Sequence, residues 1–359
     1  MPGEIQIKQF ELSERESLLA FLREAYPSEP RKSDPAYWDW HYLENPYASP
    51  ENIPVWIVKD GERIVGQAGA IPVELKVGGE IRRAVWMLEF VLLPEYRGKK
   101  LGKKLLLLAG ETYPTQLALG YNELAGNVIR SLDWVTMGTI HRYQRLLYPG
   151  HSLAEIAGSL PLRELVNFSY APLRPRRSRT LASGRFAVKE IENFNESFDH
   201  LWTRASEQWP CAVIRSAKLL EWQFKKQPGK KFEVLGVHDG ARLLGYVVLF
   251  FRKAGASGAS PKVAISDITY DPHEPNAIID ELLKASLRLA VERRAGSLVT
   301  DVLDARTEER LHRFGFWRIK AAPPFMVYSP KQQELMYKPN NWFLTRADSD
   351  VSIFEDPNL

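Results

Sequence analysis

The sequence predicts an α+β protein built from two similar units in tandem, each a mixed and mostly antiparallel sheet flanked by helices. Three observations predict this fold class. The chain has 359 residues, more than one hydrophobic core usually serves, so two domains are expected. A pattern of aromatic, glycine and proline residues recurs at an offset of about 180 residues. Within each copy, short β-rich runs with turn signals precede an amphipathic helical pattern.

The recurrence appears at several places that keep their order along the chain. An aromatic cluster at residues 40–42 matches one at residues 222–224, and a proline follows each cluster at the same spacing. A hairpin pattern with an Asp-Gly turn occurs at residues 58–66 and again at 237–245. A proline closes a β-rich run at Pro94 and at Pro272, and an aromatic turn follows at residues 132–134 and 314–316. Several matches in one order indicate an internal repeat rather than chance.

Each unit begins with a helical stretch that carries its aromatic cluster. In the first unit Trp38 and Tyr42 share one helical face, which favours a core helix over an exposed platform for stacking sugars. A strand, an Asp-Gly turn and a second strand follow. The next β-rich run opens into a helix, expected at residues 102–110 and again at 276–293. A further strand, a short helix and a last strand complete the unit.

These elements divide the chain into three parts. Residues 1–149 form the expected N-terminal domain and residues 185–359 the expected C-terminal domain. Residues 150–184 are the expected linker or crossing segment, since prolines and arginines are frequent there.

Composition and charge exclude several classes of protein. The single cysteine, Cys211, cannot form an internal disulfide or a cysteine-based zinc site, and no cluster has metal-ligand spacing, so we expect no metal. A net charge of +4 gives no reason to expect a nucleic acid partner. No apolar run approaches the roughly 20 residues of a membrane helix, so no membrane insertion is expected. With no secretory signal at the start, we expect a cytoplasmic protein. The oligomeric state stays open.

A cluster of cations crowds the start of the first repeat helix. The residues are Arg97, Lys99, Lys100, Lys103 and Lys104, with Gly98 and Gly102 among them. Free N–H groups and the helix dipole already make a helix start positive, and glycine lets an anion approach the main chain. The pattern therefore indicates a phosphate site, the alternative being a solvated basic turn.

This stretch resembles motif A of the GNAT superfamily, Val-x-Pro-x-x-Arg-Gly-x-Gly-x-Gly, in which a strand leads into a helix that cradles coenzyme A. The match lies at Pro94, Arg97, Gly98 and Gly102, while Lys100 replaces a glycine of the family pattern. A later element, Leu-Gly-Phe-x-x-x-Gly, is matched from Leu132 with Asp133 in place of its first glycine. The resemblance implies acetyl-CoA or another acyl-CoA as co-substrate. The resemblance also implies which residues bind this acyl-CoA: Phe90, Val91, Leu92, Arg97, Gly98, Lys99, Lys100, Leu101, Gly102, Lys103 and Asn127.

The resemblance also implies catalytic and acceptor residues. Glu89 interrupts an apolar strand where the family often carries its general base, although an acidic residue there can also be a solvent-facing one. The tyrosine that commonly serves as general acid is missing, because Ile129 stands at its position. Tyr121 is a substitute by proximity, and Asn122 and Glu123 are expected to line the acceptor site.

The resulting hypothesis is an N-acyltransferase that uses a small-molecule amine acceptor and has one active unit. The C-terminal copy has residues 270–276 where the phosphate loop should be, without its glycines and cations, so it is expected not to bind CoA. The end of the chain, residues 342–350, resembles bacterial proteins associated with surface polysaccharide production, which points to an amino sugar. The alternatives are a Fem-like aminoacyltransferase that uses aminoacyl-tRNA and a non-catalytic CoA-binding or scaffold protein.

Overall fold

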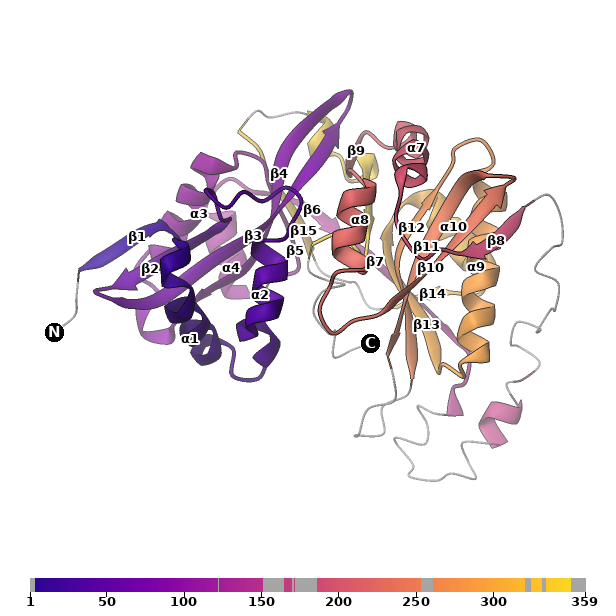
Figure 1. Cartoon of the computed structure of the whole chain (residues 1–359), viewed down its shortest axis with the longest axis horizontal. Coiled ribbons are helices and arrows are strands. Elements are labelled where there is room, and N and C mark those ends of the chain that lie inside the picture. Colours follow the sequence, from indigo (N-terminus) through magenta and orange to yellow (C-terminus); the bar gives the residue numbers. More distant parts are fainter. Residues whose placement is uncertain are drawn as a thin grey trace.

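The computed structural model describes residues 4–121, 123–150, 165–169, 171, 186–252, 261–319, 324–330 and 334–349. The chain forms two halves that lie side by side in Figure 1, with the N-terminal half on the left. Most of the expected linker, residues 150–184, lies outside the described residues.

The N-terminal half has helices α1 (Arg15–Ala25), α2 (Pro35–Tyr42), α3 (Leu101–Thr112) and α4 (Glu123–Arg130). Its strands are β1 (Ile5–Gln9), β2 (Val55–Asp60), β3 (Arg63–Val77), β4 (Glu80–Leu92), β5 (Gln116–Leu119), β6 (Val135–Thr139) and β7 (His141–Leu146). The C-terminal half has helices α7 (Glu196–Ala205), α8 (Ala217–Phe224), α9 (Pro275–Glu292) and α10 (Ala305–Arg313). Its strands are β8 (Ala187–Glu190), β9 (Cys211–Val213), β10 (Phe232–Asp239), β11 (Arg242–Arg252), β12 (Lys262–Tyr270), β13 (Ser297–Leu303), β14 (Trp317–Arg318), β15 (Pro324–Tyr328) and β16 (Trp342–Thr345).

The strands form one continuous sheet of mixed direction. Its order is β6-β15-β5-β4-β3-β9-β16-β13-β12-β11-β10-β8, and most neighbours are antiparallel. The parallel pairs are β4 with β5, β12 with β13, and β9 with β16. Because β9 and β16 lie between the two halves, they join two smaller sheets into one. The predicted α+β class with mostly antiparallel sheets is confirmed.

The two halves exchange one strand each. β7 leaves the N-terminal half and pairs antiparallel with β13 and β14. In return β15 lies between β5 and β6, where Figure 1 shows it in the left half. The sheets therefore do not follow the boundaries at 149 and 185, which remain a prediction for the chain as a linear sequence. Local sequence could not reveal the exchange, since a strand looks the same whichever sheet it joins.

The internal repeat appears as a symmetric contact between α2 and α8. Trp40 and Trp222 stack with their ring centroids 4.8 Å apart and their planes at 14°. The indole Nε1 of Trp40 donates to the carbonyl of Trp222 at 3.0 Å, and that of Trp222 donates to the carbonyl of Trp40 at 2.9 Å. The last carbonyls of a helix have no partner within it, so each indole caps the other helix.

The repeat also explains a departure from the family pattern. Gly315 has φ +74°, a left-handed conformation that favours glycine, and Asp133 has φ +59° at the matching place in the first unit. Aspartate tolerates this region better than most residues, which is how the turn keeps its shape without the glycine.

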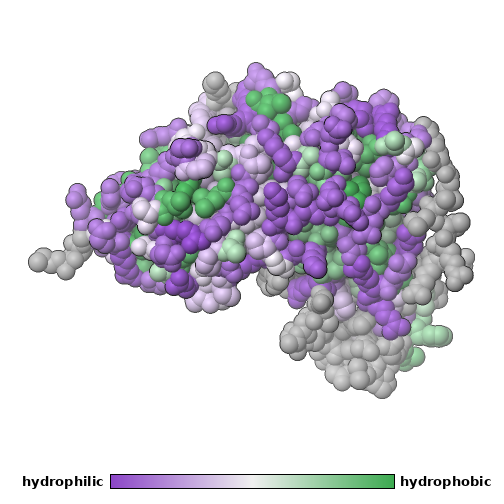
Figure 2. Space-filling view, viewed as in Figure 1, coloured by the Kyte–Doolittle hydropathy of each residue, from purple (hydrophilic) through white to green (hydrophobic). Residues whose placement is uncertain are grey.

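The helices of each half cover the sheet and enclose separate cores. One core lies between β2–β4 and helices α1 and α3, and another lies between α7, α9 and β10–β13. A third, which includes Trp40 and Trp222, fills the junction of the halves. The face in Figure 2 is mostly hydrophilic, with hydrophobic side chains in small separate groups. Among the described residues, even the longest helix lacks the length and apolar character needed to cross a bilayer.

Candidate active site

A bulge distorts β4 at Glu89. Leu88 pairs with Gly69 and Val91 with Gln67, so Glu89 and Phe90 together face one residue of β3. Glu89 has φ +47°, a conformation that residues other than glycine rarely adopt. Bulges of this kind often lie beside functional sites because they redirect side chains and peptide groups.

Beyond the start of β5, β4 and β5 separate. Their parallel register is recorded only at Val85↔Gln116 and Trp86↔Leu117. In the described part of the chain, the carboxyl end of β4 pairs with β3 on one edge and with no strand on the other. A ligand inserted at this edge can therefore bind the peptide groups of β4.

The turn after β4 carries the predicted cluster of cations. Gly98 with φ +78° and Lys100 with φ +59° bend the chain into α3. The first N–H groups of α3 have no partner within the helix, and the Lys100 side chain does not cap them. The side chains of Arg97, Lys99, Lys100, Lys103 and Lys104 are exposed, and none forms an ion pair among the described residues. Arg97 Nε and Lys103 Nζ donate hydrogen bonds to the carbonyls of Leu92 and Ser131, at 3.0 and 3.3 Å. Cations without a carboxylate partner beside free N–H groups suit a phosphate.

The bulge, the strand separation and the cationic turn meet at one groove of about 640 Å³. The lining residues are Phe90, Val91, Leu92, Arg97, Gly98, Lys100, Leu101, Gly102, Lys103, Leu124, Ala125, Asn127, Val128 and Ser131. One part is cationic and the other apolar, so the groove matches a molecule with a phosphate end and an apolar end. Gly102 is required for its shape, since a Cβ there would lie 2.7 Å from the Phe90 ring.

Most of the predicted CoA-binding residues line this groove, and Lys99 is the exception. Its ammonium group instead lies over the ring of Tyr96, 4.9 Å from the centroid. Asn127 lines the groove from α4 and accepts a hydrogen bond from Arg130 at 2.7 Å.

The predicted catalytic and acceptor residues lie outside the groove lining. Tyr121 packs against α4, where a Cβ on Gly126 would come within 2.7 Å of its ring. Glu123 is exposed at the start of α4. Asn122 lies outside the described residues. Glu89 is 7% exposed and lies directly before the lining residue Phe90.

Glu89 is held by side chains that the sequence did not reveal. The Tyr42 hydroxyl donates to Glu89 Oε2 at 2.5 Å, and Gln67 Nε2 donates to the same oxygen at 2.9 Å. Burial raises the pKa of Tyr42 well above its usual value, and the negative charge of Glu89 adds to this effect. Tyr42 was predicted to be a core aromatic and is indeed buried. The signal for Gln67 was a polar residue within the apolar strand from Ile64 to Pro72.

The matching loop of the C-terminal half is built differently. Asp271 stands before α9 and accepts hydrogen bonds from Arg204 Nε at 2.6 Å and Arg242 at 3.0 Å. The helix then begins with Pro275, which lacks an N–H donor. A carboxylate and a proline at this place do not favour a phosphate.

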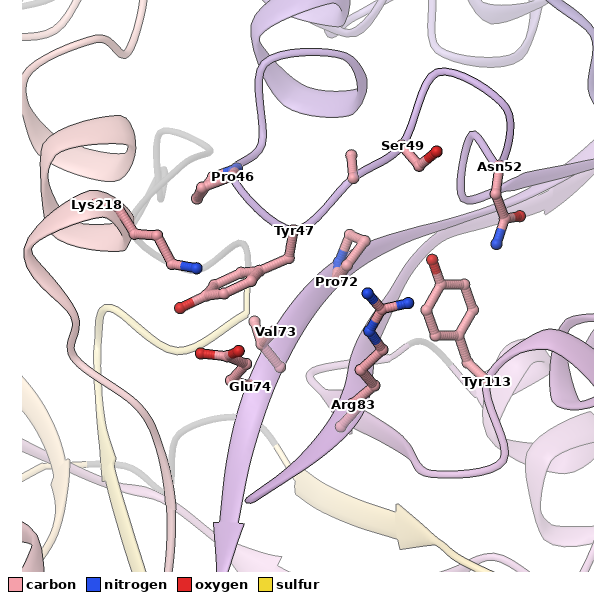
Figure 3. A pocket seen from close by; sticks show the side chains of 12 residues that line it. Pro46, Tyr47, Ser49, Asn52, Pro72, Val73, Glu74, Arg83, Tyr113 and Lys218 are labelled. Atoms are coloured by element: carbon pink, nitrogen blue, oxygen red, sulfur yellow. The ribbon is translucent and has the colours of Figure 1, made fainter.

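A second cavity, of about 230 Å³, lies at the opposite end of β4. Figure 3 shows Glu74 and Arg83 beside it on β3 and β4, and Lys218 reaching toward it from α8. At about 3.3 Å per residue, Arg83 is roughly 20 Å along the strand from Glu89. This cavity is therefore separate from the groove. No group of three or more His, Cys, Asp or Glu side chains within the described ranges could hold a metal ion.

Comparison with known proteins agrees with this geometry. Residues 6–118 match the model of the acetyltransferase (GNAT) domain. Three solved structures share the fold across both halves. A probable N-acyltransferase from Enterococcus faecalis is 13% identical with a TM-score of 0.62, and the match covers 90% of this chain and 72% of that one. Saccharomyces cerevisiae N-myristoyltransferase with bound myristoyl-CoA is 13% identical with a TM-score of 0.60, over 91% and 84% of the two chains.

A GCN5-related N-acetyltransferase from Anabaena variabilis is 11% identical with a TM-score of 0.61, over 90% and 72% of the two chains. No curated protein sequence matches the chain significantly. At these identities the structures show a common fold, and the domain model covers the part of the chain that carries the β4 bulge and the cationic turn. Residues 6–118 therefore match an acetyltransferase (GNAT) domain, and the chain as a whole shares the fold of these solved acyltransferases.

Proposed function

We propose that the N-terminal unit transfers an acyl group from acyl-CoA to a primary amine. The observation that carries this proposal is the groove in which cations without a carboxylate partner at the α3 start meet an apolar wall at the β4 bulge. The cations and free N–H groups of α3 bind the CoA pyrophosphate. The pantetheine arm follows the unpaired edge of β4 toward Phe90, Val91 and Leu92.

The chemical step needs a base for the amine and donors for the thioester oxygen. Glu89 is our proposed base, acting directly or through a water molecule, since it lies beside the groove and is held in one orientation. Peptide N–H groups at the bulge polarise the thioester carbonyl. Tyr121 is our candidate to protonate the leaving thiolate, with Asn122 and Glu123 at the acceptor side.

The acyl donor and the acceptor are the finer parts of the proposal. Acetyl-CoA is the first candidate donor, and longer acyl-CoAs are included because the groove has an apolar wall with Leu124 and Val128. An amino sugar is the first candidate acceptor, on the resemblance at the end of the chain. We propose that the domains span residues 1–149 and 185–359, that the C-terminal domain does not bind CoA, and that the enzyme acts in the cytoplasm.

Isothermal titration with CoA, acetyl-CoA and longer acyl-CoAs tests the binding site. Arg97→Ala combined with Gly98→Val should abolish measurable CoA binding, because it removes a cation and obstructs the turn. His273→Ala with Asn276→Ala in the C-terminal copy is the matched control and should leave affinity unchanged. If the first variant folds and binds CoA like the wild type, the groove is not the CoA site.

Thiol release from acetyl-CoA with a panel of amines tests the reaction. Turnover with a primary amine is expected. CoA binding without turnover on any amine would contradict the enzymatic proposal and favour a CoA-binding protein, and transfer that requires aminoacyl-tRNA would replace it with the Fem-like reaction.

A further inference from the structure

Gln67 carries an unpartnered hydrogen-bond acceptor beside Glu89. Its side chain is fully buried, and its Oε1 has no hydrogen-bond partner. The orientation of the amide follows from chemistry, because a carboxylate accepts hydrogen bonds and only the NH₂ group of Gln67 can donate one to Glu89. Leaving such an acceptor buried and unpaired is costly, so it points to a donor that arrives with a ligand or a water molecule.

The C-terminal copy shows that the fold itself does not require this unpaired acceptor. By the repeat, Tyr246 on β11 and Asp267 on β12 stand where Gln67 and Glu89 stand in the first unit. There Tyr246 donates to Asp267 Oδ2 at 2.7 Å, and Thr345 donates to Oδ1 at 2.6 Å. Neither Asp267 nor Tyr246 is among the unpartnered buried groups of the described residues. The copy has its own bulge in β12, where Asp267 pairs with Val248 and Ile265 with Leu249, and no residue of that bulge has a positive φ.

The rest of the environment fixes Glu89 but leaves Gln67 Oε1 unpaired. A Cβ on Gly69 would lie 2.2 Å from the Tyr42 hydroxyl, so only glycine lets that hydroxyl reach the carboxylate. His41 stacks on Tyr42 with centroids 4.5 Å apart, and burial lowers the pKa of His41 to about 3, with a smaller effect of nearby Lys32 and Arg31. His41 is therefore neutral in the range where an enzyme is assayed.

We propose that Gln67 Oε1 accepts an N–H of the acceptor amine, or of the water that relays its proton, and that Tyr42 is a positioning residue for Glu89. This inference rests on the proposed function. A primary amine has two N–H groups, and the pair Glu89 and Gln67 offers an acceptor for each. The site therefore selects a primary over a secondary amine.

The step balances in atoms and electrons. The lone pair of the neutral amine forms a bond to the thioester carbonyl carbon, and Glu89 receives one N–H proton. The C–S bond then breaks, and its electron pair leaves with the CoA thiolate, which takes a proton from Tyr121. Tyr121 regains a proton from solvent, and Glu89 releases the amine proton to solvent. The products are the amide and CoA, and Gln67 Oε1 holds the remaining N–H throughout.

The test compares Gln67→Met, Tyr42→Phe and Tyr246→Phe with the wild type. Each is assayed for kcat and KM for a primary amine and its N-methyl derivative, for the pH profile, and for CoA affinity. Gln67→Met should lower kcat/KM for the primary amine by about 10- to 100-fold, the range expected for an unmade buried hydrogen bond, and reduce the preference over the N-methyl amine. CoA affinity should stay within about twofold.

Tyr42→Phe removes a donor that stabilises the charged carboxylate, so the acidic limb of kcat/KM should move to higher pH. Tyr246→Phe is the control in the copy and should lower thermal stability without changing kinetics or amine preference. An unchanged kcat/KM and preference in Gln67→Met would overturn the role of Gln67, and an unchanged pH limb in Tyr42→Phe would overturn that of Tyr42. If Gln67→Met does not fold, the wild-type preference decides for Gln67, because an equal kcat/KM for the primary amine and its N-methyl derivative would overturn its role. Absence of wild-type turnover on any amine would instead refute the proposed function, and this inference with it.

Discussion

The mutual capping of α2 and α8 makes a quantitative prediction about how the two halves unfold. In Trp40→Phe the ring is kept but the indole N–H is lost, so the carbonyl of Trp222 is left buried without its donor. An unsatisfied buried acceptor costs about 1–3 kcal/mol. The smaller ring also leaves a small cavity, for which we add about 1 kcal/mol. We therefore expect a loss of about 2–4 kcal/mol in the free energy of unfolding.

The strand exchange determines which parts of the protein are destabilised by Trp40→Phe. Since β7 and β15 each belong to the sheet of the other half, neither half can lose its structure alone without breaking a strand pair of its partner. We expect Trp40→Phe to shift the unfolding of both halves together. Urea unfolding followed by circular dichroism measures the size of the effect. Hydrogen exchange of peptides from β3–β4 and from β11–β12 measures its distribution.

The matched control is Trp317→Phe, the same substitution at a residue that is 40% exposed, and it should change stability by less than about 0.5 kcal/mol. If Trp40→Phe costs as little as the control, the capping argument is wrong. If only the N-terminal peptides lose protection, the two halves unfold independently despite the exchange.

Three further predictions concern the phosphate loop, acid stability and a turn. The combined Lys100→Gln and Lys103→Gln variant should bind CoA more weakly at low salt, and its affinity should depend less on salt, because two cations of the groove are lost. Titration at several salt concentrations measures this effect. Lys284→Gln on α9 is the control. Burial alone would raise the pKa of Asp271, but hydrogen bonds from Arg204 and His273 lower it from 3.8 to about 2. The charged carboxylate therefore stabilises the folded state above about pH 4, and this stabilisation is lost as the pH falls through 2. Urea unfolding should therefore show Arg204→Gln to be less stable than wild type at pH 7, with a smaller difference near pH 2; an equal difference at both values would contradict the assignment. Asp133→Gly should raise the free energy of unfolding by up to about 1 kcal/mol, since it relieves a left-handed conformation, and a loss in thermal unfolding would show that the aspartate stabilises the turn.

The sequence alone determined the features that depend on neighbouring residues or on a repeat. The α+β class, the hairpins and the helix starts follow from turn residues and hydrophobic periodicity over short windows. The cationic turn could be found because Arg97, Gly98 and Gly102 lie within a few residues of one another. The internal repeat was visible because each copy has an aromatic cluster at the same place. The tryptophans of these two clusters, Trp40 and Trp222, stack on each other in the structure.

Only the tertiary structure decided which distant residues meet. Tyr42 lies on α2 and Gln67 on β3, and both reach Glu89 because a bulge in β4 turns that carboxylate toward them. Neither spacing nor periodicity encodes this meeting, since it depends on how three elements pack. The exchange of β7 and β15 is likewise a choice between two places, one beside β13 and one beside β5, and the alternation of side chains along a strand is the same in either place. The physical reason is the same in both cases. Local sequence sets the conformation of each helix or strand, whereas burial of its whole apolar face decides which other elements it packs against.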